Sequence, residues 1–282
     1  MVRNPYYSPL RYPGGKRILV PSIKEILKKA SLDNITYIEP YVGGGGVALN
    51  LLFTGIAKEI HINDFDFAIY SFWKAILEQT DRFIEIISNI PVTIDEWHKQ
   101  KEVYENKDNN DYFKVGIATF FLNRTNRSGI LKGGVMGGQE QKSKYKIDCR
   151  FNKLPLLERI KRIGSYKSKI HVYNFDALEL LREKQEIFSN DSFTFLDPPY
   201  YNKGAELYEN HYSHNDHLEL ASTITNILLN KNWILTYDNT PEIINMYEEF
   251  HHDYYSLKYT AGKKKTGKEI MVLSKSIAKY MD

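Results

Sequence analysis

The residues whose types and spacing are best suited to chemistry are Asp197-Pro198-Pro199-Tyr200. They follow the apolar run 193–196, which predicts a short buried strand. Neither proline can donate a backbone hydrogen bond, so the strand must end in a stiff, extended turn. Open α/β sheets bind ligands at this end of their strands. A nucleobase could be held there by its exocyclic amine and stacked on Tyr200. A strand-terminating turn without chemistry is the alternative.

A second candidate is the run Gly43–Gly46, between a predicted strand at 35–39 and a predicted helix that begins near Val47. Strand, glycine loop and helix in this order are typical of nucleotide-cofactor sites, because glycines let the backbone approach a ligand closely. The spacing is not G-x-G-x-x-G, and no Lys-Ser or Lys-Thr pair follows. The loop therefore suits an adenosyl ligand without phosphates.

Two acidic residues have alternative roles beside this loop. Asp64 ends a predicted strand at 59–64, where Rossmann-like sheets place the acid that binds ribose hydroxyls. It could also cap the helix predicted at 65–77. Asp176 opens another predicted helix, and it either caps that helix or contacts the adenine of the cofactor. We favour the cap. Nearer the N-terminus, Tyr12 and Lys16 flank a Pro-Gly-Gly turn and could reach a ligand, or this could be a simple loop before a helix.

The charge distribution points to a polyanionic partner. The net charge is +3, but residues 124–169 hold 13 basic and 3 acidic residues, a net charge of +10. The rest of the chain is therefore at −7. A solvated basic face is the alternative to a nucleic-acid contact.

Within this part of the chain, helical periodicity fails at residues 123–139, where arginines, amides and glycines alternate. Such side chains can read base edges and backbone, although a flexible basic linker is the alternative. The candidate DNA-binding residues are Asn123, Arg124, Asn126, Arg127, Lys132, Lys142 and Lys144.

Composition excludes several other classes. The 282 residues allow one large domain or a core with an insertion. No apolar run is long enough to span a membrane, and no secretory signal is visible. The single cysteine, Cys149, excludes an internal disulfide, and we expect the cytoplasm. His211, His214 and His217 lack a zinc-site pattern, so we expect no metal and a loop closing over the site instead.

The remaining elements complete an α/β pattern. Residues 81–123 read as helical, with a core stripe at Phe113, Ile117, Phe120 and Phe121. A helix is expected near 154–163 and another at 218–228. Further strands are expected at 169–173 and 232–237, and a hairpin at 254–259 and 268–273.

Four motifs in this order resemble the Dam-type DNA N6-adenine methyltransferases, which form the alpha-group, D12 class. The motifs are Tyr12-Pro-Gly-Gly-Lys16, Glu39-Pro-Tyr-Val-Gly-Gly-Gly-Gly46, Asp64 and Asp197-Pro-Pro-Tyr200. The sequence departs from that family in having Tyr12 where tryptophan is usual, and in its four consecutive glycines. The recognition segment shares Leu122-Asn123-Arg124 and then diverges from the enzymes that read GATC, so the target sequence stays open.

The resemblance implies a Rossmann-like sheet that binds S-adenosylmethionine (SAM), with a mostly helical inserted target-recognition domain. The implied domains are residues 1–77 and 165–282 for the catalytic core and residues 78–164 for the insert. The implied partner is double-stranded DNA, with a restriction endonuclease as a functional partner and a monomer or weak dimer as the assembly. The expected cofactor residues are Tyr12, Gly14, Lys16, Glu39, Pro40, Gly43, Gly45, Asp64, Asp176 and Asp197.

The expected chemistry is direct methyl transfer to a flipped base. If Asp197 and the Pro198 carbonyl accept the two amine hydrogens, the nitrogen can turn its lone pair toward the methyl group. The turn itself suits cytosine N4, an RNA base or adenine equally, and the resemblance decides for adenine N6. A non-catalytic DNA-binding protein with a vestigial SAM pocket is the alternative from another class.

Overall fold

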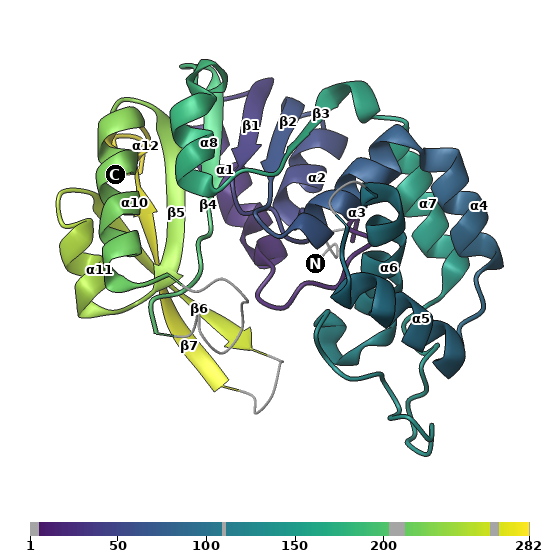
Figure 1. The fold of residues 1–282 in the computed structure, drawn as a ribbon. Coiled ribbons are helices and arrows are strands. Elements are labelled where there is room, and N and C mark those ends of the chain that lie inside the picture. Colours follow the sequence, from purple (N-terminus) through teal and green to yellow (C-terminus); the bar gives the residue numbers. More distant parts are fainter. Residues whose placement is uncertain (1–5, 109–110, 203–211, 260–264, 282) are drawn as a thin grey trace. The chain divides into compact units, whose positions relative to one another are not determined.

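A computed structural model describes residues 6–108, 111–202, 212–259 and 265–281. Helices and strands alternate before residue 67 and again from residue 170 to residue 238, and helices follow one another through residues 67–164 between them, which gives the α/β class expected from the sequence, with a mostly helical middle (Figure 1). The strands are β1 (Ile35–Glu39), β2 (Ala57–Asn63), β3 (Ile170–Tyr173), β4 (Ser192–Leu196), β5 (Asn232–Asp238), β6 (His251–Tyr259) and β7 (Lys265–Leu273). The longer helices are α1 (Val20–Lys29), α2 (Gly46–Phe53), α3 (Phe67–Glu78), α4 (Thr80–Asn89), α5 (Ile94–Glu105), α6 (Tyr112–Thr125), α7 (Lys153–Gly164), α8 (Ala177–Glu183), α10 (His214–Ile227) and α11 (Pro241–Met246).

The strands form one seven-stranded sheet in the order β3-β2-β1-β4-β5-β7-β6. Strand β1 pairs in parallel with β2 and β4, and β4 pairs in parallel with β5. The hairpin β6–β7 is antiparallel, and β7 joins it to β5. All five residues of β1 and of β4 are buried, as central strands covered on both faces require. This arrangement is a Rossmann-like α/β fold.

The chain divides into two compact units. One comprises residues 1–16, 43–50 and 64–174, and the other comprises residues 17–42, 51–63 and 175–282. The sequence placed α3 in the catalytic core, but α3 belongs to the same unit as α4 to α7. The physical reason is its packing, because Phe72 of α3 stacks on Phe120 of α6 with ring centroids 5.8 Å apart. The predicted domain boundaries differ from these compact units, and the division into a catalytic core and a target-recognition insert stays a prediction.

The first unit is mostly helical. Its core gathers aromatic rings from α3, α4 and α6, including Phe72, Phe83 and Phe120. The stripe predicted on α6 is buried, which confirms that it is core. In Figure 1 the long segment between α6 and α7 extends beyond the helices of this unit.

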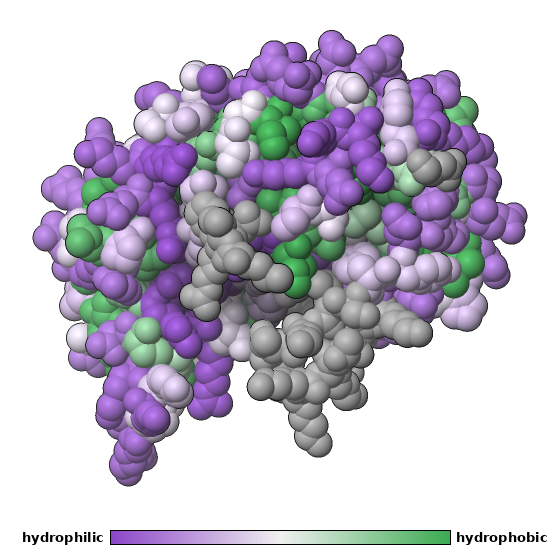
Figure 2. Space-filling view, turned by 180° about the vertical axis from the view of Figure 1, so that it is seen from behind, coloured by the Kyte–Doolittle hydropathy of each residue, from purple (hydrophilic) through white to green (hydrophobic). Residues whose placement is uncertain are grey.

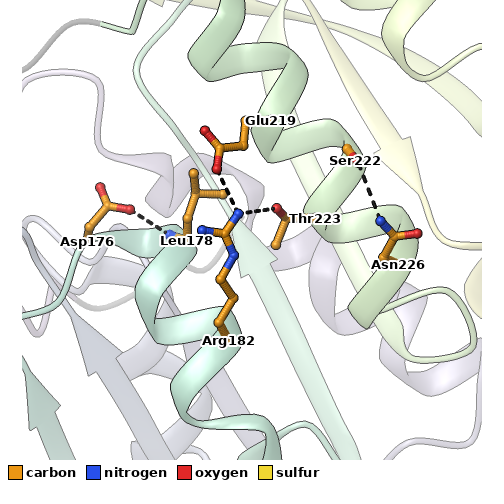
Figure 3. Close-up of polar contacts among 7 residues, drawn as sticks. All are labelled: Asp176, Leu178, Arg182, Glu219, Ser222, Thr223 and Asn226. Atoms are coloured by element: carbon orange, nitrogen blue, oxygen red, sulfur yellow. Dashed lines mark hydrogen bonds and ion pairs between the residues drawn. The ribbon is translucent and has the colours of Figure 1, made fainter.

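The second unit holds the centre of the sheet and the helices α8 and α10, which pack against each other. Figure 3 shows Arg182 of α8 between Glu219 and Thr223 of α10, with nitrogen–oxygen distances of 2.7 and 3.3 Å. Beneath these polar contacts lies an apolar core that includes Leu196, Trp233 and Tyr237. The carboxyl ends of β4 and β5 are thereby held on a rigid base.

The C-terminal hairpin is confirmed, with strands β6 and β7 longer than predicted and a tip that lies outside the described residues. Hydrophilic residues cover most of the described surface on the face shown in Figure 2. In the described part of the chain, every helix is too short or too polar to cross a membrane.

Candidate active site

The glycine loop after β1 lies directly against Tyr12. Gly43 has a φ of +45°, and a Cβ there would come 2.6 Å from Cε1 of the Tyr12 ring. Gly45 also has a positive φ, of 59°. The Gly43 carbonyl accepts a hydrogen bond from Nε1 of Trp73 at 3.1 Å. A side chain at position 43 would be both strained and displaced by the ring, so the loop requires glycine there.

The turn before α1 is formed as predicted. The amide of Gly15 donates to the Tyr12 carbonyl at 3.2 Å, and Gly14 has a φ of +78°. Lys16 is 5% exposed, and its ammonium group donates to the Gly14 carbonyl at 3.1 Å. These contacts fix the approach of Tyr12 to the glycine loop. Cofactor binding by Gly14 and Lys16 stays a prediction.

Asp64 lies where β2 ends, and its carboxylate faces the glycine loop. One oxygen accepts the amide of Gly43 at 2.9 Å and the other accepts the amide of Asp66 at 3.0 Å. Burial, with the nearby charge of Asp66 next in importance, raises the pKa of Asp64 from 3.8 to about 7, although the two backbone hydrogen bonds oppose the shift. The cap of α3 is Asp66, which accepts the amide of Ala68, so the capping role considered for Asp64 is wrong.

In the second unit, Asn63 connects the ends of two segments. Its amide nitrogen donates to the carbonyls of Pro40 and Phe175, at 2.9 and 3.0 Å, and its oxygen accepts the amide of Phe175 at 2.8 Å. Sequence reasoning missed this residue. The available signal was an amide side chain at the end of a predicted strand, directly before Asp64. Glu39, predicted beside Pro40, is 4% exposed and accepts from the hydroxyl of Tyr37 at 3.2 Å.

Asp176 caps α8, which is the role that we favoured. Its carboxylate accepts the amide of Leu178 at 2.9 Å (Figure 3). The second oxygen is drawn away from that bond in the same view. A contact with the adenine of a cofactor stays a prediction.

Asp197 follows the last residue of β4 and is half-buried. The hydroxyl of Thr236, on the adjacent strand β5, lies 2.7 Å from Oδ1 of Asp197 and donates to it. The strand, the proline turn and the carboxylate are thus where the sequence placed them.

Tyr200 is more buried than its predicted role of stacking on a base requires. The ring is 5% exposed and belongs to the core cluster that includes Ile38 and Tyr237. Burial raises the pKa of Tyr200 far above its ordinary value, and the charges of Asp197 and Glu269 raise it further. Because the ring is not open to solvent in this conformation, stacking on a base requires neighbouring chain to move. The stacking role stays a prediction.

Asn123 and Arg124 use their polar groups inside the protein. The Asn123 side chain is 1% exposed and makes hydrogen bonds of 2.7 and 2.8 Å with the backbone of Arg11. Arg124 is 9% exposed and donates to the carbonyls of Arg150 and Pro9. Burial, with the charge of Arg11 next in importance, lowers the pKa of Arg124 to about 10. The expectation that these two residues contact DNA directly does not fit these contacts.

Asn126 is also structural. It is fully buried, its oxygen accepts from Nε1 of Trp97 at 2.7 Å, and its nitrogen donates to the carbonyls of Ile130 and Leu131 at 2.9 and 2.8 Å. These partners use both amide hydrogens and the side-chain oxygen. The expected direct DNA contact is therefore replaced by a role in holding the segment that follows α6.

We expect Asn126→Ala to lower the melting temperature, since it leaves the Trp97 donor and two carbonyls without their partner. Each orphaned buried group costs about 1–3 kcal/mol. Thermal unfolding followed by circular dichroism measures the loss. Asn226→Ala, on the exposed face of α10, is the matched control and should melt within a degree or two of wild type. Equal melting of both variants would contradict the structural role.

Arg127, Lys132, Lys142 and Lys144 are exposed, as a direct contact with DNA requires. The loop that carries Lys142 and Lys144 is closed by Gln141. Its amide nitrogen donates to the carbonyls of Met136 and Gly138, at 2.7 and 2.6 Å, and its oxygen accepts the amide of Ile147 at 2.8 Å. These hydrogen bonds give the loop a defined conformation, which does not fit the flexible linker considered from the sequence.

Two of the three histidines considered as metal ligands interact with tyrosines. His214 lies 2.9 Å from the hydroxyl of Tyr201, and His217 lies 2.7 Å from that of Tyr237. Burial lowers the pKa of His217 to about 4. His214 and His217 lie in α10, which begins earlier than the helix predicted at 218–228, so this part of the expected closing loop is helical. His211 lies outside the described residues.

The mixed sheet with its parallel central strands, the glycine loop after β1 and the carboxylate after β4 agree with the methyltransferase class that the sequence motifs implied. The sequence model of the D12 class N6 adenine-specific DNA methyltransferases matches residues 12–261, so the chain belongs to that family. It is also 30% identical over 209 residues to the type II methyltransferase M.MjaIII of Methanocaldococcus jannaschii, covering 68% of each chain. The chain is thus an adenine-specific DNA methyltransferase by family, as the sequence motifs implied.

Two solved structures are more distantly similar. A candidate RNA methyltransferase of Pyrococcus horikoshii is 11% identical, with a TM-score of 0.43 and coverage of 96% of this chain and 90% of that one. A candidate methyltransferase of Escherichia coli is 10% identical, with a TM-score of 0.37 and coverage of 95% and 90%. Similarity at this level says nothing about substrate.

Proposed function

We propose that this protein transfers a methyl group from SAM to N6 of an adenine flipped out of double-stranded DNA. The observation that carries the proposal is the pairing of β1 with β4. Because these strands are parallel neighbours, the chain leading into the glycine loop and the turn that begins at Asp197 leave from the same edge of the sheet.

The residues around the glycine loop fit SAM. The absence of a Cβ at Gly43 lets the Tyr12 ring pack against the loop backbone, and the carboxyl of Asp64 faces that loop. Asp64 would accept the ribose hydroxyls, and Tyr12 would line the pocket. When bound, SAM supplies an electrophilic methyl group on a sulfonium.

Asp197 acts on the other reactant. In the proposed arrangement its carboxylate and the Pro198 carbonyl accept the hydrogens of the adenine amine, so that the nitrogen lone pair is free to attack. Thr236 holds one carboxylate oxygen and thereby fixes the direction of the acceptor. Positioning and preorganised acceptors supply most of the rate enhancement in such a reaction.

DNA binding is proposed for the exposed residues of the +10 segment, namely Arg127, Lys132, Lys142 and Lys144. The phosphate backbone attracts these cations without sequence preference, and the built loop around Gln141 presents two of them. The amine of a paired adenine is unreachable for an in-line attack, so the base must leave the duplex. A duplex substrate agrees with the cytoplasmic setting expected from the sequence.

We expect replacement of Lys142 and Lys144 by glutamine to weaken DNA binding and to flatten its dependence on salt. Each lost phosphate contact should reduce the slope of log K against log salt by about one unit. Fluorescence anisotropy with a labelled duplex at several salt concentrations measures the slope. Lys28→Gln with Lys29→Gln, on the exposed side of α1, is the matched control. Equal slopes in both double variants would show that the basic loop does not face DNA.

The proposed reaction is tested by its product. The protein is incubated with duplex DNA and isotopically labelled SAM, and the DNA is then digested to nucleosides for mass spectrometry. Labelled N6-methyladenine is the expected product. Labelled N4-methylcytosine, or methylation of RNA in place of duplex DNA, would contradict the proposal in favour of one of the alternative substrates.

The relative from Methanocaldococcus jannaschii is by name a type II methyltransferase. On that ground we propose that this chain protects a site that a cognate restriction endonuclease cleaves. A monomer or weak dimer stays the assembly expected from the sequence. DNA methylated by the protein in the cell should then resist one endonuclease that cleaves the unmethylated site.

A further inference from the structure

Two side chains of β5 lie at the proline turn. Thr236 and Asp238 are two residues apart on the strand, and alternate residues of a strand point to the same face. Both are buried, at 0% and 4% exposure. Thr236 donates to Oδ1 of Asp197, at the start of the turn.

Asp238 holds the chain where it leaves the turn. Its Oδ1 accepts the amide of Tyr201 at 2.9 Å, and its Oδ2 accepts the amide of Asn202 at 3.0 Å. The two prolines have no amide hydrogen, so the backbone cannot be held at those positions by this kind of bond. Asp238 instead uses two consecutive amides that follow shortly after them.

The strand that carries this pair is itself fixed on both sides. β5 pairs in parallel with β4, where Leu235 is opposite Leu196, and antiparallel with β7, where Asp238 is opposite Glu269. A catalytic carboxylate on a loop is placed less precisely than one on a strand. The hydrogen bonds of Thr236 and Asp238 attach the turn to this strand and restrict its movement.

We propose that Thr236 and Asp238 are positioning residues that fix the two ends of the catalytic turn, so that Asp197 and the Pro198 carbonyl keep the geometry that amine binding needs. This inference rests on the proposed function, because it assumes that Asp197 acts on the amine. Neither residue needs to touch DNA or cofactor. Small displacements of a reacting group, of about 1 Å, lower rates by about 100-fold.

The test uses Thr236→Val, which keeps the shape of the side chain and removes its hydroxyl. Thr194→Val is the matched control, since Thr194 is a buried threonine on the neighbouring strand β4 whose hydroxyl has no hydrogen-bond partner among the described residues. Single-turnover methyl transfer at saturating SAM and DNA gives the rate, and binding titrations give the affinities. We expect Thr236→Val to be about 10–100-fold slower with both affinities within twofold of wild type. Thr194→Val should match wild type, and Thr236→Ser should recover most of the rate.

The pH–rate profile supplies a readout that a purely structural role would not move. A hydrogen bond to a carboxylate favours its charged form, so the acid limb of the profile should move to higher pH in Thr236→Val. Asp238→Asn, which cannot accept both amides, should lower the rate with the DNA affinity unchanged. The inference is overturned if Thr236→Val and Asp238→Asn transfer methyl groups as fast as Thr194→Val.

Failure of this inference and failure of the proposed function are separable with Asp197→Ala. If that variant is inactive while Thr236→Val and Asp238→Asn are fully active, only the positioning role is wrong. If Asp197→Ala is as active as wild type, the catalytic assignment of Asp197 is wrong and the positioning role falls with it.

Discussion

Replacing Asp197 with alanine is expected to reduce methyl transfer by about 10²–10⁴-fold or more, since the variant loses an acceptor for the amine and the group that receives its proton. Affinity for DNA should persist, because the proposed phosphate contacts belong to another segment of the chain. Asp197→Asn keeps the shape but loses the charge, and it has one acceptor oxygen, which must serve both the Thr236 hydroxyl and the substrate amine. It should be severely impaired as well.

Single-turnover kinetics with saturating SAM and duplex DNA separates this loss of chemistry from a loss of binding. Asp191→Ala is the matched control, because Asp191 is an exposed acid immediately before β4. A control that also loses activity would point to disruption of the strand. An active Asp197→Ala variant would remove the proposed role of the carboxylate.

Replacing Asp64 with alanine is expected to weaken SAM binding by about 1.5–3 kcal/mol, the scale of a hydrogen bond to a charged group. Titration calorimetry measures this loss directly. Asp64→Asn should lose much of the same free energy, and Asp33→Asn, at an exposed acid before β1, should bind as wild type does. SAM binding by Asp64→Ala at wild-type affinity would contradict the role of this carboxylate.

The pKa of Asp64, raised by burial to about 7, adds a dependence on pH. Ribose hydroxyls donate hydrogen bonds to the charged carboxylate, so the affinity for SAM should rise by up to about tenfold between pH 6 and 8. In Asp64→Asn this dependence should disappear. The folded protein without SAM responds in the opposite sense. In the folded protein the Asp64 carboxyl binds a proton more tightly than it does in the unfolded chain. The stability that this protonation contributes to folding is therefore lost as the pH rises from about 4 to about 7. A wild-type affinity that stays constant over this range would contradict the account.

The regular elements were predictable because their signals are local. The apolar run 193–196 followed by two prolines could only be a strand that stops, and β4 ends there. The stripe on α6 repeats at helical spacing and is buried. The glycine loop was equally clear, although its reason, the ring of Tyr12 against Gly43, depends on residues far apart in the sequence.

The polar residues at the end of α6 show where such reasoning fails. Asn123, Arg124 and Asn126 have the side chains that read bases, but the same donors and acceptors can satisfy buried backbone groups. Which use prevails depends on Arg11 and Trp97, whose proximity no local pattern reveals. Tyr200 is a similar case, because an aromatic ring suits both a stacking surface and a core.

The supporting residues were hidden for a different reason. Thr236 and Asp238 have ordinary residue types for a strand and its end, and only the adjacency of β4 and β5 brings them to the proline turn. Asn63 likewise becomes informative only when its partners Pro40 and Phe175 are known. Spacing in the sequence identifies a motif. The residues that hold the motif in place are recognised only when the order of the strands in the sheet is known.

The most direct test of the central claim is to express the protein in cells and to map modified adenines across the genome by sequencing native DNA. The account predicts N6-methyladenine at every copy of one short sequence in the cells that express the wild type, and none at that sequence in cells that express Asp197→Ala. A genome without new methyladenine, with the folded wild-type protein present, would contradict the account. Methyladenine at the same sites in the Asp197→Ala cells would contradict its mechanism.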